Sequence, residues 1–184
     1  EEKARLCTET VQKEKELLKA FPYKEGYSLY IGIPFCPSTC LYCSFTSYSI
    51  DQFENIVQDY LEALLKELDF VAKTYAHKEL QTMYIGGGTP TSLKEEDLEY
   101  LLYEVNKRFP FSKIQEITVE AGRPDSLNFE KLKILKKYGV TRISINPQSM
   151  NDKTLKLIGR NHFAQDIKEK FNLARQAGID NINM

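Results

Sequence analysis

Segments typical of β-strands alternate with segments typical of α-helices along most of this 184-residue chain. The short apolar segments have strand composition, and the longer ones have helical periodicity. The predicted strands cover residues 27–34, 82–85, 116–120 and 142–146, with a fifth beginning within 179–184. The predicted helices cover residues 52–76, 95–109, 129–138 and 164–177. This order predicts an α/β fold made of βαβ units around a parallel sheet.

Apolar and polar residues alternate within the predicted strands. In the first strand Leu29, Ile31 and Ile33 share one face, and Tyr30 lies on the other. Strands of an open doubly wound sheet are buried on both faces, so they have continuous apolar runs instead. An antiparallel sheet would also alternate, but the intervening helices argue against it. With helices on the apolar face, the polar faces converge on a concave interior, which predicts a wide or incomplete β/α barrel around a ligand.

The first part of the chain differs from the rest. Residues 1–21 have helical periodicity and predict an amphipathic helix with an apolar stripe of Leu6, Val11, Leu17, Leu18 and Phe21. We therefore divide the chain into a helical lead-in, residues 1–26, and a core, residues 27–184. Because the chain begins with Glu1 and its last predicted strand is barely started, we expect it to be a piece of a longer protein.

Charge and hydrophobicity limit the classes of partner that the chain is expected to bind. The chain has 25 Lys and Arg against 26 Asp and Glu, a net charge of −1, which gives no electrostatic reason to expect nucleic acid or an anionic membrane surface. No apolar run approaches the ~20 residues that span a bilayer, and the first residues lack the features of a signal peptide. We expect a cytoplasmic protein that binds small molecules.

Three of the four cysteines, Cys36, Cys40 and Cys43, directly follow the first predicted strand. Structural zinc sites usually have four ligands in two separated pairs, and the two histidines lie far away in the sequence. The pattern is therefore compatible with zinc completed by Cys7, with three ordinary buried thiols, or with an iron–sulfur cluster. Three thiolates on a four-iron cluster leave one iron free to bind another molecule, which would imply chemistry.

Other candidate ligand-binding residues follow the remaining strands. Three consecutive glycines and a threonine come after the second strand, where they permit close approach of a ligand or form an ordinary turn. Glu120 ends the third strand on its polar face, Gln148 follows the fourth, and Arg160 comes twelve residues later. In a β/α barrel, these carboxyl ends of the strands form the active-site rim. Taken singly, each residue is also explained by solvent exposure.

Together these motifs resemble those of the radical S-adenosylmethionine (SAM) enzymes. Within that group the chain is similar to the oxygen-independent coproporphyrinogen III oxidases, also called coproporphyrinogen dehydrogenases, and to their relatives. The resemblance runs from about residue 27 to the end. It rests on the stretches LYIGIPFC, CLYCSF, YIGGGTPTSL, ITVEAGRPD, RISINPQSM and LIGRNH.

The resemblance implies a partial parallel barrel with about five of six strands, and two cofactors, a [4Fe-4S] cluster and SAM. The implied cluster ligands are Cys36, Cys40 and Cys43. The implied SAM contacts are Tyr30, Tyr42, Gly86, Gly87, Gly88, Thr89, Glu120, Gln148 and Arg160. A flavodoxin or ferredoxin would supply electrons. Hydrogen abstraction from the β-carbon of two propionates of coproporphyrinogen III, followed at each by loss of CO2 and one further electron, would give the vinyl groups of protoporphyrinogen IX.

Three positions depart from the pattern. Members best matched to the decarboxylation have a fourth cysteine where this chain has Phe45, and the Phe is instead typical of heme-chaperone relatives. Gly32 and Asn146-Pro147 also differ, although EAGRPD and NPQSM resemble a divergent bacterial branch of the dehydrogenases. Three hypotheses follow: a coproporphyrinogen decarboxylase, a heme carrier on the same scaffold, and a zinc-bound domain without enzymatic activity. We expect the 184 residues alone not to turn over substrate.

Overall fold

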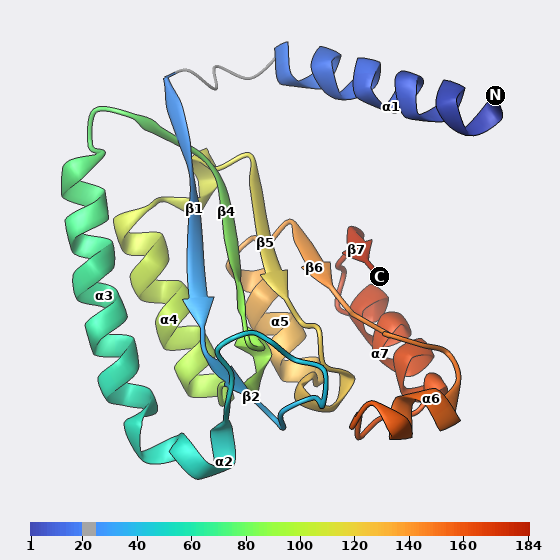
Figure 1. Ribbon diagram of the computed structural model, residues 1–184. Helices are drawn as coiled ribbons and strands as arrows, with labels where there is room; N and C mark the ends of the chain where they lie inside the picture. The colour runs from blue at the N-terminus through green and yellow to red at the C-terminus, as the bar shows by residue number, and fades with distance from the viewer. Residues whose placement is uncertain (20–24) are drawn as a thin grey trace.

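The computed structural model describes residues 1–19 and 25–184, and it contains a five-stranded parallel sheet. The strand order β1-β4-β5-β6-β7 follows the chain, which confirms the predicted α/β fold (Figure 1). These strands are β1 (Gly26–Ile33), β4 (Glu79–Gly87), β5 (Glu116–Glu120), β6 (Arg142–Ser144) and β7 (Ile182–Asn183). Two short strands, β2 (Phe35–Cys36) and β3 (Tyr48–Ser49), pair separately in the loop after β1.

Four helices cover one face of the sheet and leave its other face open (Figure 1). They are α3 (Val57–Thr74), α4 (Glu95–Arg108), α5 (Phe129–Lys137) and α7 (Ala164–Gln176), and each packs against the next. The predicted helices over 95–109, 129–138 and 164–177 therefore form. Helices α5 and α7 are followed by Gly139 (φ 75°) and Gly178 (φ 82°), the left-handed residues that commonly end a helix.

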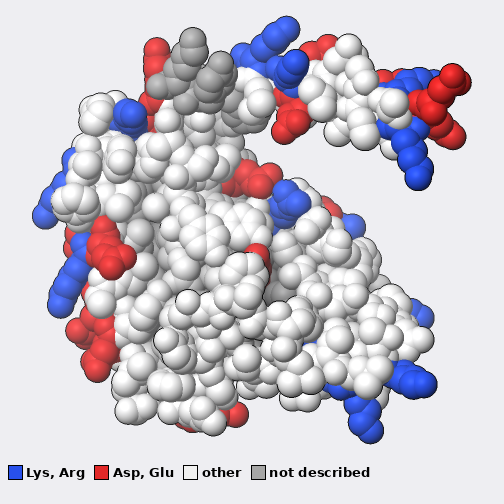
Figure 2. Space-filling model, viewed as in Figure 1, with Lys and Arg blue, Asp and Glu red and all other residues white. Residues whose placement is uncertain are grey.

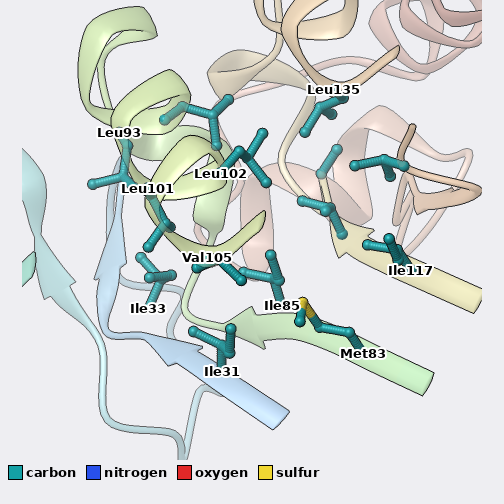
Figure 3. Close-up of a cluster of buried hydrophobic side chains, with 14 of the residues drawn as sticks. Ile31, Ile33, Met83, Ile85, Leu93, Leu101, Leu102, Val105, Ile117 and Leu135 are labelled. Atoms are coloured by element: carbon teal, nitrogen blue, oxygen red, sulfur yellow. The ribbon is translucent and has the colours of Figure 1, made fainter. Parts of the chain in front are cut away.

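The core lies between the sheet and these helices. Ile31 and Ile33 of β1, Met83 and Ile85 of β4 and Ile117 of β5 are each at most 1% exposed. Figure 3 shows them packed against a layer of helix side chains that includes Leu101, Leu102, Val105 and Leu135. The predicted alternation is confirmed in β1, because Ile31 and Ile33 are buried whereas Tyr30, directly before Ile31, is 60% exposed on the open face.

Several boundaries differ from the prediction. The helix predicted over 52–76 is interrupted: α2 (Ile50–Phe53) and a 3₁₀ turn (Glu54–Ile56) precede α3. Strand β4 extends through two glycines that were expected in the following loop, because they continue the pairing with β1. A short helix, α6 (Asp152–Leu157), and three further 3₁₀ turns were not predicted: Pro90–Ser92, Phe111–Lys113 and Pro124–Ser126.

The predicted N-terminal helix is present as α1 (Glu2–Lys19). It has no buried residue, so its apolar stripe of Leu6, Val11, Leu17 and Leu18 is exposed. Phe21, which was assigned to the same stripe, lies outside the described residues. In the part of the chain that the structure describes, no helix combines the length and hydrophobicity needed to cross a membrane.

Candidate functional site

A cavity of about 190 Å³ lies at the carboxyl ends of the strands, beneath the loop that follows β1. Eleven of the twelve residues expected to bind cofactors line it. They are Tyr30, Cys36, Cys40, Tyr42, Cys43, Gly87, Gly88, Thr89, Glu120, Gln148 and Arg160. Strand topology thus brings together side chains that lie up to 130 residues apart in the sequence.

The exception is Gly86. A Cβ at this position would lie 2.7 Å from Cε1 of Tyr84 and 2.9 Å from Oε2 of Glu120. Gly86 therefore makes room for these two side chains and does not itself line the cavity.

Gly87 and Gly88 approach the chain's own backbone closely. A Cβ on Gly88 would lie 2.6 Å from the carbonyl oxygen of Phe35, and one on Gly87 would lie 3.0 Å from the backbone N and O of Ile33. The backbone N–H of Gly88 donates to the Ile33 carbonyl at 2.7 Å, and that of Thr89 donates to Phe35 at 2.7 Å. The close approach expected for a ligand is therefore made by the start of the cysteine loop, which the glycines fix next to β4.

Each of the three clustered cysteines has one polar side-chain partner. Cys36 Sγ lies 3.4 Å from Thr89 Oγ1, and Cys43 Sγ lies 3.9 Å from Ser47 Oγ. Cys40 Sγ accepts a hydrogen bond of 3.3 Å from Arg123 Nη1. Burial raises the pKa of the Cys36 thiol above its usual value.

Cys7 does not lie with the three clustered thiols. Within residues 1–19 and 25–184, no three or more His, Cys, Asp or Glu side chains are close enough to hold one metal ion. Cys7 lies exposed on α1 and does not line the cavity.

A tyrosine pair stands beside Glu120 on the open face. The Tyr84 hydroxyl donates to Glu120 Oε1 at 2.6 Å, and the Tyr84 ring stacks on Tyr30 with centroids 5.7 Å apart. Burial and the neighbouring carboxylate raise the pKa of Tyr84 to about 12. Tyr84 therefore remains a proton donor at neutral pH and fixes one carboxylate oxygen of Glu120, while the other oxygen accepts no hydrogen bond from the residues that the structure describes. The sequence did not single out Tyr84; its register opposite Tyr30 reveals the pairing.

Gln148 is held in an unfavourable backbone conformation. Its φ is 60°, which makes it the only non-glycine residue with positive φ in the described chain. L-residues rarely adopt this conformation, and strained residues are concentrated at functional sites. Gln148 is among the residues that line the cavity.

Arg160 is positioned by the end of α6. Gly159 has φ 76°, and the backbone N–H of Arg160 donates to the Leu155 carbonyl at 2.9 Å, which closes the helix and turns the arginine into the cavity. Its Nη2 donates to the Tyr42 hydroxyl at 3.2 Å. Its Nε and Nη1 are buried and have no partner in the described chain. Unpaired guanidinium donors fit a carboxylate or hydroxyl group of a ligand.

Several further residues that the sequence motifs did not indicate also line the cavity. Arg123 follows β5, is 3% exposed and faces the cysteine loop. The other lining residues not assigned a role were Ser38, Phe45, Ser47, Gly122 and Asn146. A signal for Arg123 was present, since it falls within the ITVEAGRPD stretch, but its contacts are long-range and cannot be read from spacing.

Charged residues are scarce around the mouth of this site. Figure 2 shows Lys, Arg, Asp and Glu mainly near the margins of the open face, with a largely uncharged surface over the lower centre. The loop of residues 34–47 contains no charged residue, and its exposed side chains include Leu41, Tyr42 and Phe45. The rim of the cavity is therefore uncharged and partly aromatic.

A second cavity, of about 630 Å³, lies at the opposite end of the sheet. It is lined by residues that include Tyr27, Tyr75, Lys78, Arg108 and Lys113, and none of the predicted site residues is among them. The chemistry-bearing side chains therefore converge on the smaller cavity.

Stability is expected to fall below neutral pH because of His162. This side chain is 3% exposed, and neither ring nitrogen makes a well-formed hydrogen bond with the described residues. Burial lowers its pKa below 6.5, and this effect exceeds the opposing influence of the Pro147 backbone. As the pH falls through about 6.5, the unfolded state binds the proton first, so the free energy of unfolding decreases. Urea titrations from about pH 7.5 to 5.5 should show this slope. His162→Gln should reduce it, whereas exposed His77→Gln should not; an unchanged slope in His162→Gln would contradict the assignment.

Comparisons with known proteins agree with this geometry. The family model described as the radical SAM superfamily matches residues 30–184 of the chain. The chain is 44% identical over 191 residues to the oxygen-independent coproporphyrinogen-III oxidase-like protein HemZ of Bacillus subtilis, covering 100% of this chain and 38% of the relative. It is 45% identical over 159 residues to the heme chaperone HemW of the same organism, covering 85% and 41%. The chain thus spans about two fifths of the length of these curated relatives.

Among solved structures, the chain is similar to the coproporphyrinogen III oxidase HemN of Escherichia coli, described as a radical SAM enzyme. The TM-score is 0.76 at 27% identity, and the match covers 86% of this chain and 36% of that protein. The radical SAM methyltransferase TsrM of Kitasatospora setae, solved with cobalamin and a [4Fe-4S] cluster bound, shares the fold. Its TM-score is 0.53 at 15% identity, and the match covers 85% of this chain and 30% of that protein.

Proposed function

The chain belongs to the radical SAM superfamily, whose cofactors are a [4Fe-4S] cluster and SAM, and on this premise we propose that the cavity beneath the cysteine loop binds both. Cys36, Cys40 and Cys43 would each bind one iron and leave the fourth iron for SAM. The observation that carries this proposal is the convergence of the three thiols with the two unpaired donors of Arg160 in one cavity.

The residues present fit these cofactors. The three thiols come from one short loop, and no carboxylate among the residues lining the cavity competes with them except Glu120. At about 190 Å³ the cavity is smaller than the roughly 300–1,000 Å³ of ordinary ligand pockets. A cofactor bound in it would therefore extend onto the open face, where Tyr30 and Glu120 lie.

We assign a separate role to each polar side chain. Glu120, held by Tyr84, would accept from a donor group of SAM, and Arg160, held by Tyr42, would donate to its ribose or carboxylate oxygens. Gln148 would add a neutral contact. When bound and reduced, the cofactors supply one-electron chemistry that removes a hydrogen atom from an unactivated carbon. The protein orients them and limits access of water.

For the reaction we propose the oxidative decarboxylation of coproporphyrinogen III propionates to vinyl groups, giving protoporphyrinogen IX. Two similarities support this substrate. The 44% identical relative is named an oxygen-independent coproporphyrinogen-III oxidase-like protein, and the structure with TM-score 0.76 is a coproporphyrinogen III oxidase. The uncharged rim of the site agrees with a large tetrapyrrole.

A specific observation favours a second candidate, heme carriage on the same scaffold. Phe45 stands where a fourth cysteine would belong in decarboxylating members, and it is 75% exposed at the rim of the cavity. The 45% identical relative is named a heme chaperone. An exposed aromatic ring next to Leu41 and Tyr42 is suited to contact a flat apolar macrocycle.

An anaerobic turnover assay tests the proposed function. The full-length protein is reconstituted with iron and sulfide and given SAM, a reductant and coproporphyrinogen III, and deoxyadenosine and vinyl product are measured together. Both products appearing would support the decarboxylase. Deoxyadenosine without vinyl product would exclude the decarboxylase but keep SAM cleavage, and heme titration would then test the carrier. Absence of both, with a four-iron cluster present, would contradict the enzymatic proposal.

Two substitutions of Gln148 should separate its effect on SAM binding from its effect on the stability of the fold. We expect Gln148→Ala and Gln148→Gly both to weaken SAM binding while leaving iron content unchanged, because the amide is lost but the cysteines remain. Gly tolerates φ 60°, so Gln148→Gly should be more stable than Gln148→Ala by about 1 kcal/mol. Calorimetric titration with SAM and urea unfolding measure the two effects. Unchanged SAM affinity in both variants would remove the proposed contact.

A further inference from the structure

Arg123 connects the carboxyl end of β5 to the cysteine loop. Its Nη1 donates to Cys40 Sγ at 3.3 Å and to the Ser38 carbonyl at 3.1 Å. Its Nη2 donates to Ser38 Oγ at 2.9 Å. On the other side Asp125 accepts from Nε at 3.0 Å and from Nη2 at 2.8 Å. The guanidinium is thus fixed from two directions.

Burying the charged guanidinium of Arg123 costs free energy, which suggests that its charge has a role in the site. A guanidinium that is 3% exposed has lost most of its hydration, which is only partly offset by a single carboxylate. An apolar residue in the same volume would pack at lower cost. The Arg123 guanidinium instead forms an ion pair with Asp125 and donates a hydrogen bond to the thiol of Cys40, which we assign as an iron ligand.

We propose that Arg123 raises the reduction potential of the iron–sulfur cluster by donating a charged hydrogen bond to the Cys40 thiolate, and that Asp125 opposes this effect. The inference rests on the proposed function, because it requires Cys40 to bind the cluster. Reduction adds one negative charge to the cluster, and a nearby cation stabilises that state. Hydrogen bonds to ligand sulfur act in the same direction. Arg123 touches neither SAM nor substrate in this role, so it is a positioning residue.

The other charged neighbours act on the cluster less directly. Arg160 lines the same cavity, but its Nη2 donates to Tyr42, and it makes no hydrogen bond to a cysteine within the described residues. Cys36 and Cys43 accept from neutral hydroxyls or donate to them. Cys40 is therefore the one cluster cysteine with a cationic partner in the described chain.

Three variants and a matched control test the proposal by potentiometric titration of the reconstituted full-length protein, with the reduced cluster measured by electron paramagnetic resonance. In Arg123→Met, we expect the ratio of reduced to oxidised cluster at a fixed potential to fall about tenfold, equivalent to about 59 mV for one electron. Asp125→Asn should raise the ratio. Arg123→Lys, which keeps the charge, should restore part of the loss. Arg108→Met removes a carboxylate-paired arginine lining the distant cavity and should change nothing.

Each outcome decides the proposal. An unchanged potential in Arg123→Met with four irons retained would overturn it, and so would equal shifts in Arg123→Met and Arg108→Met. If Arg123→Met loses the cluster, Asp125→Asn decides: a higher potential supports the proposal, and an unchanged or lower one rejects it. Failure of the unsubstituted protein to assemble a four-iron cluster would reject the proposed function itself, a result distinct from all of these.

Discussion

Cys40→Ala is expected to abolish both cluster assembly and SAM cleavage. Two thiolates would remain for a cluster that we assign three, and the substitution would also leave one buried donor of Arg123 without its sulfur partner. Iron and acid-labile sulfide should fall well below four per chain after reconstitution. Deoxyadenosine formation should fall to the background of a reaction without protein. Both quantities are measured on one anaerobic preparation.

A second cysteine provides the control for this result. Cys7 is exposed on α1 and lies outside the cavity, so Cys7→Ala should retain the full iron content and SAM cleavage. Loss of the cluster in both variants would point to damage during preparation. A complete four-iron cluster in Cys40→Ala would instead exclude Cys40 as a ligand and, with it, the role proposed for Arg123.

The sequence predicted the strands that carry the core because burial follows their alternation. Ile31 and Ile33 are buried and Tyr30 is exposed, as a helix-covered strand requires. Strand β4 was predicted too short because glycine normally weakens a strand, and here Gly86 and Gly87 continue the pairing opposite Gly32 and Ile33. Only the neighbouring strand reveals that these glycines remain in the sheet.

Short elements were missed for a different reason. Strands β2 and β3 have two residues each, and α6 has six. None of the three is long enough to show the hydrophobic periodicity of a strand or a helix. The segment predicted as one helix over 52–76 is helical, but its first turns form part of α2 and a 3₁₀ turn that precede α3. These are features of tertiary packing.

The site was predicted to the extent that its residues belong to recognisable motifs. Eleven of the twelve expected residues line one cavity. Gly86 was the exception, because its role is to admit the side chains of Tyr84 and Glu120. Arg123 was missed because its partner Cys40 is 83 residues away, and no spacing rule joins them. Motifs thus identify the residues that face the cavity, whereas the residues that hold them in place emerge from the fold.

Gly87→Ala is expected to destabilise the protein more than Gly139→Ala and to weaken SAM binding. Both glycines have positive φ, 106° and 75°, so both substitutions carry a backbone cost of about 1–2 kcal/mol. At Gly139 a Cβ would meet nothing within 4 Å, whereas at Gly87 it would lie 3.0 Å from the backbone N and O of Ile33. Overpacking adds about 1–3 kcal/mol, so Gly87→Ala should cost about 3 kcal/mol in the free energy of unfolding.

Comparing Gly87→Ala with Gly139→Ala separates the cost of a strained backbone from the effect of displacing the cysteine loop. Because the crowded contact is with the backbone that leads into Cys36, relief of the clash requires the loop to move away from β4. Gly87→Ala should therefore lower iron content and SAM affinity, measured by metal analysis and calorimetric titration, while Gly139→Ala should lower only stability in urea. Equal losses of stability with unchanged iron content would show that the loop does not depend on the close approach of β4. The cysteines would then have to be held in place by the other contacts of the loop. These include the hydrogen bonds from Arg123 to Ser38 and Cys40, from Arg160 to Tyr42, and from Leu41 to the end of α6.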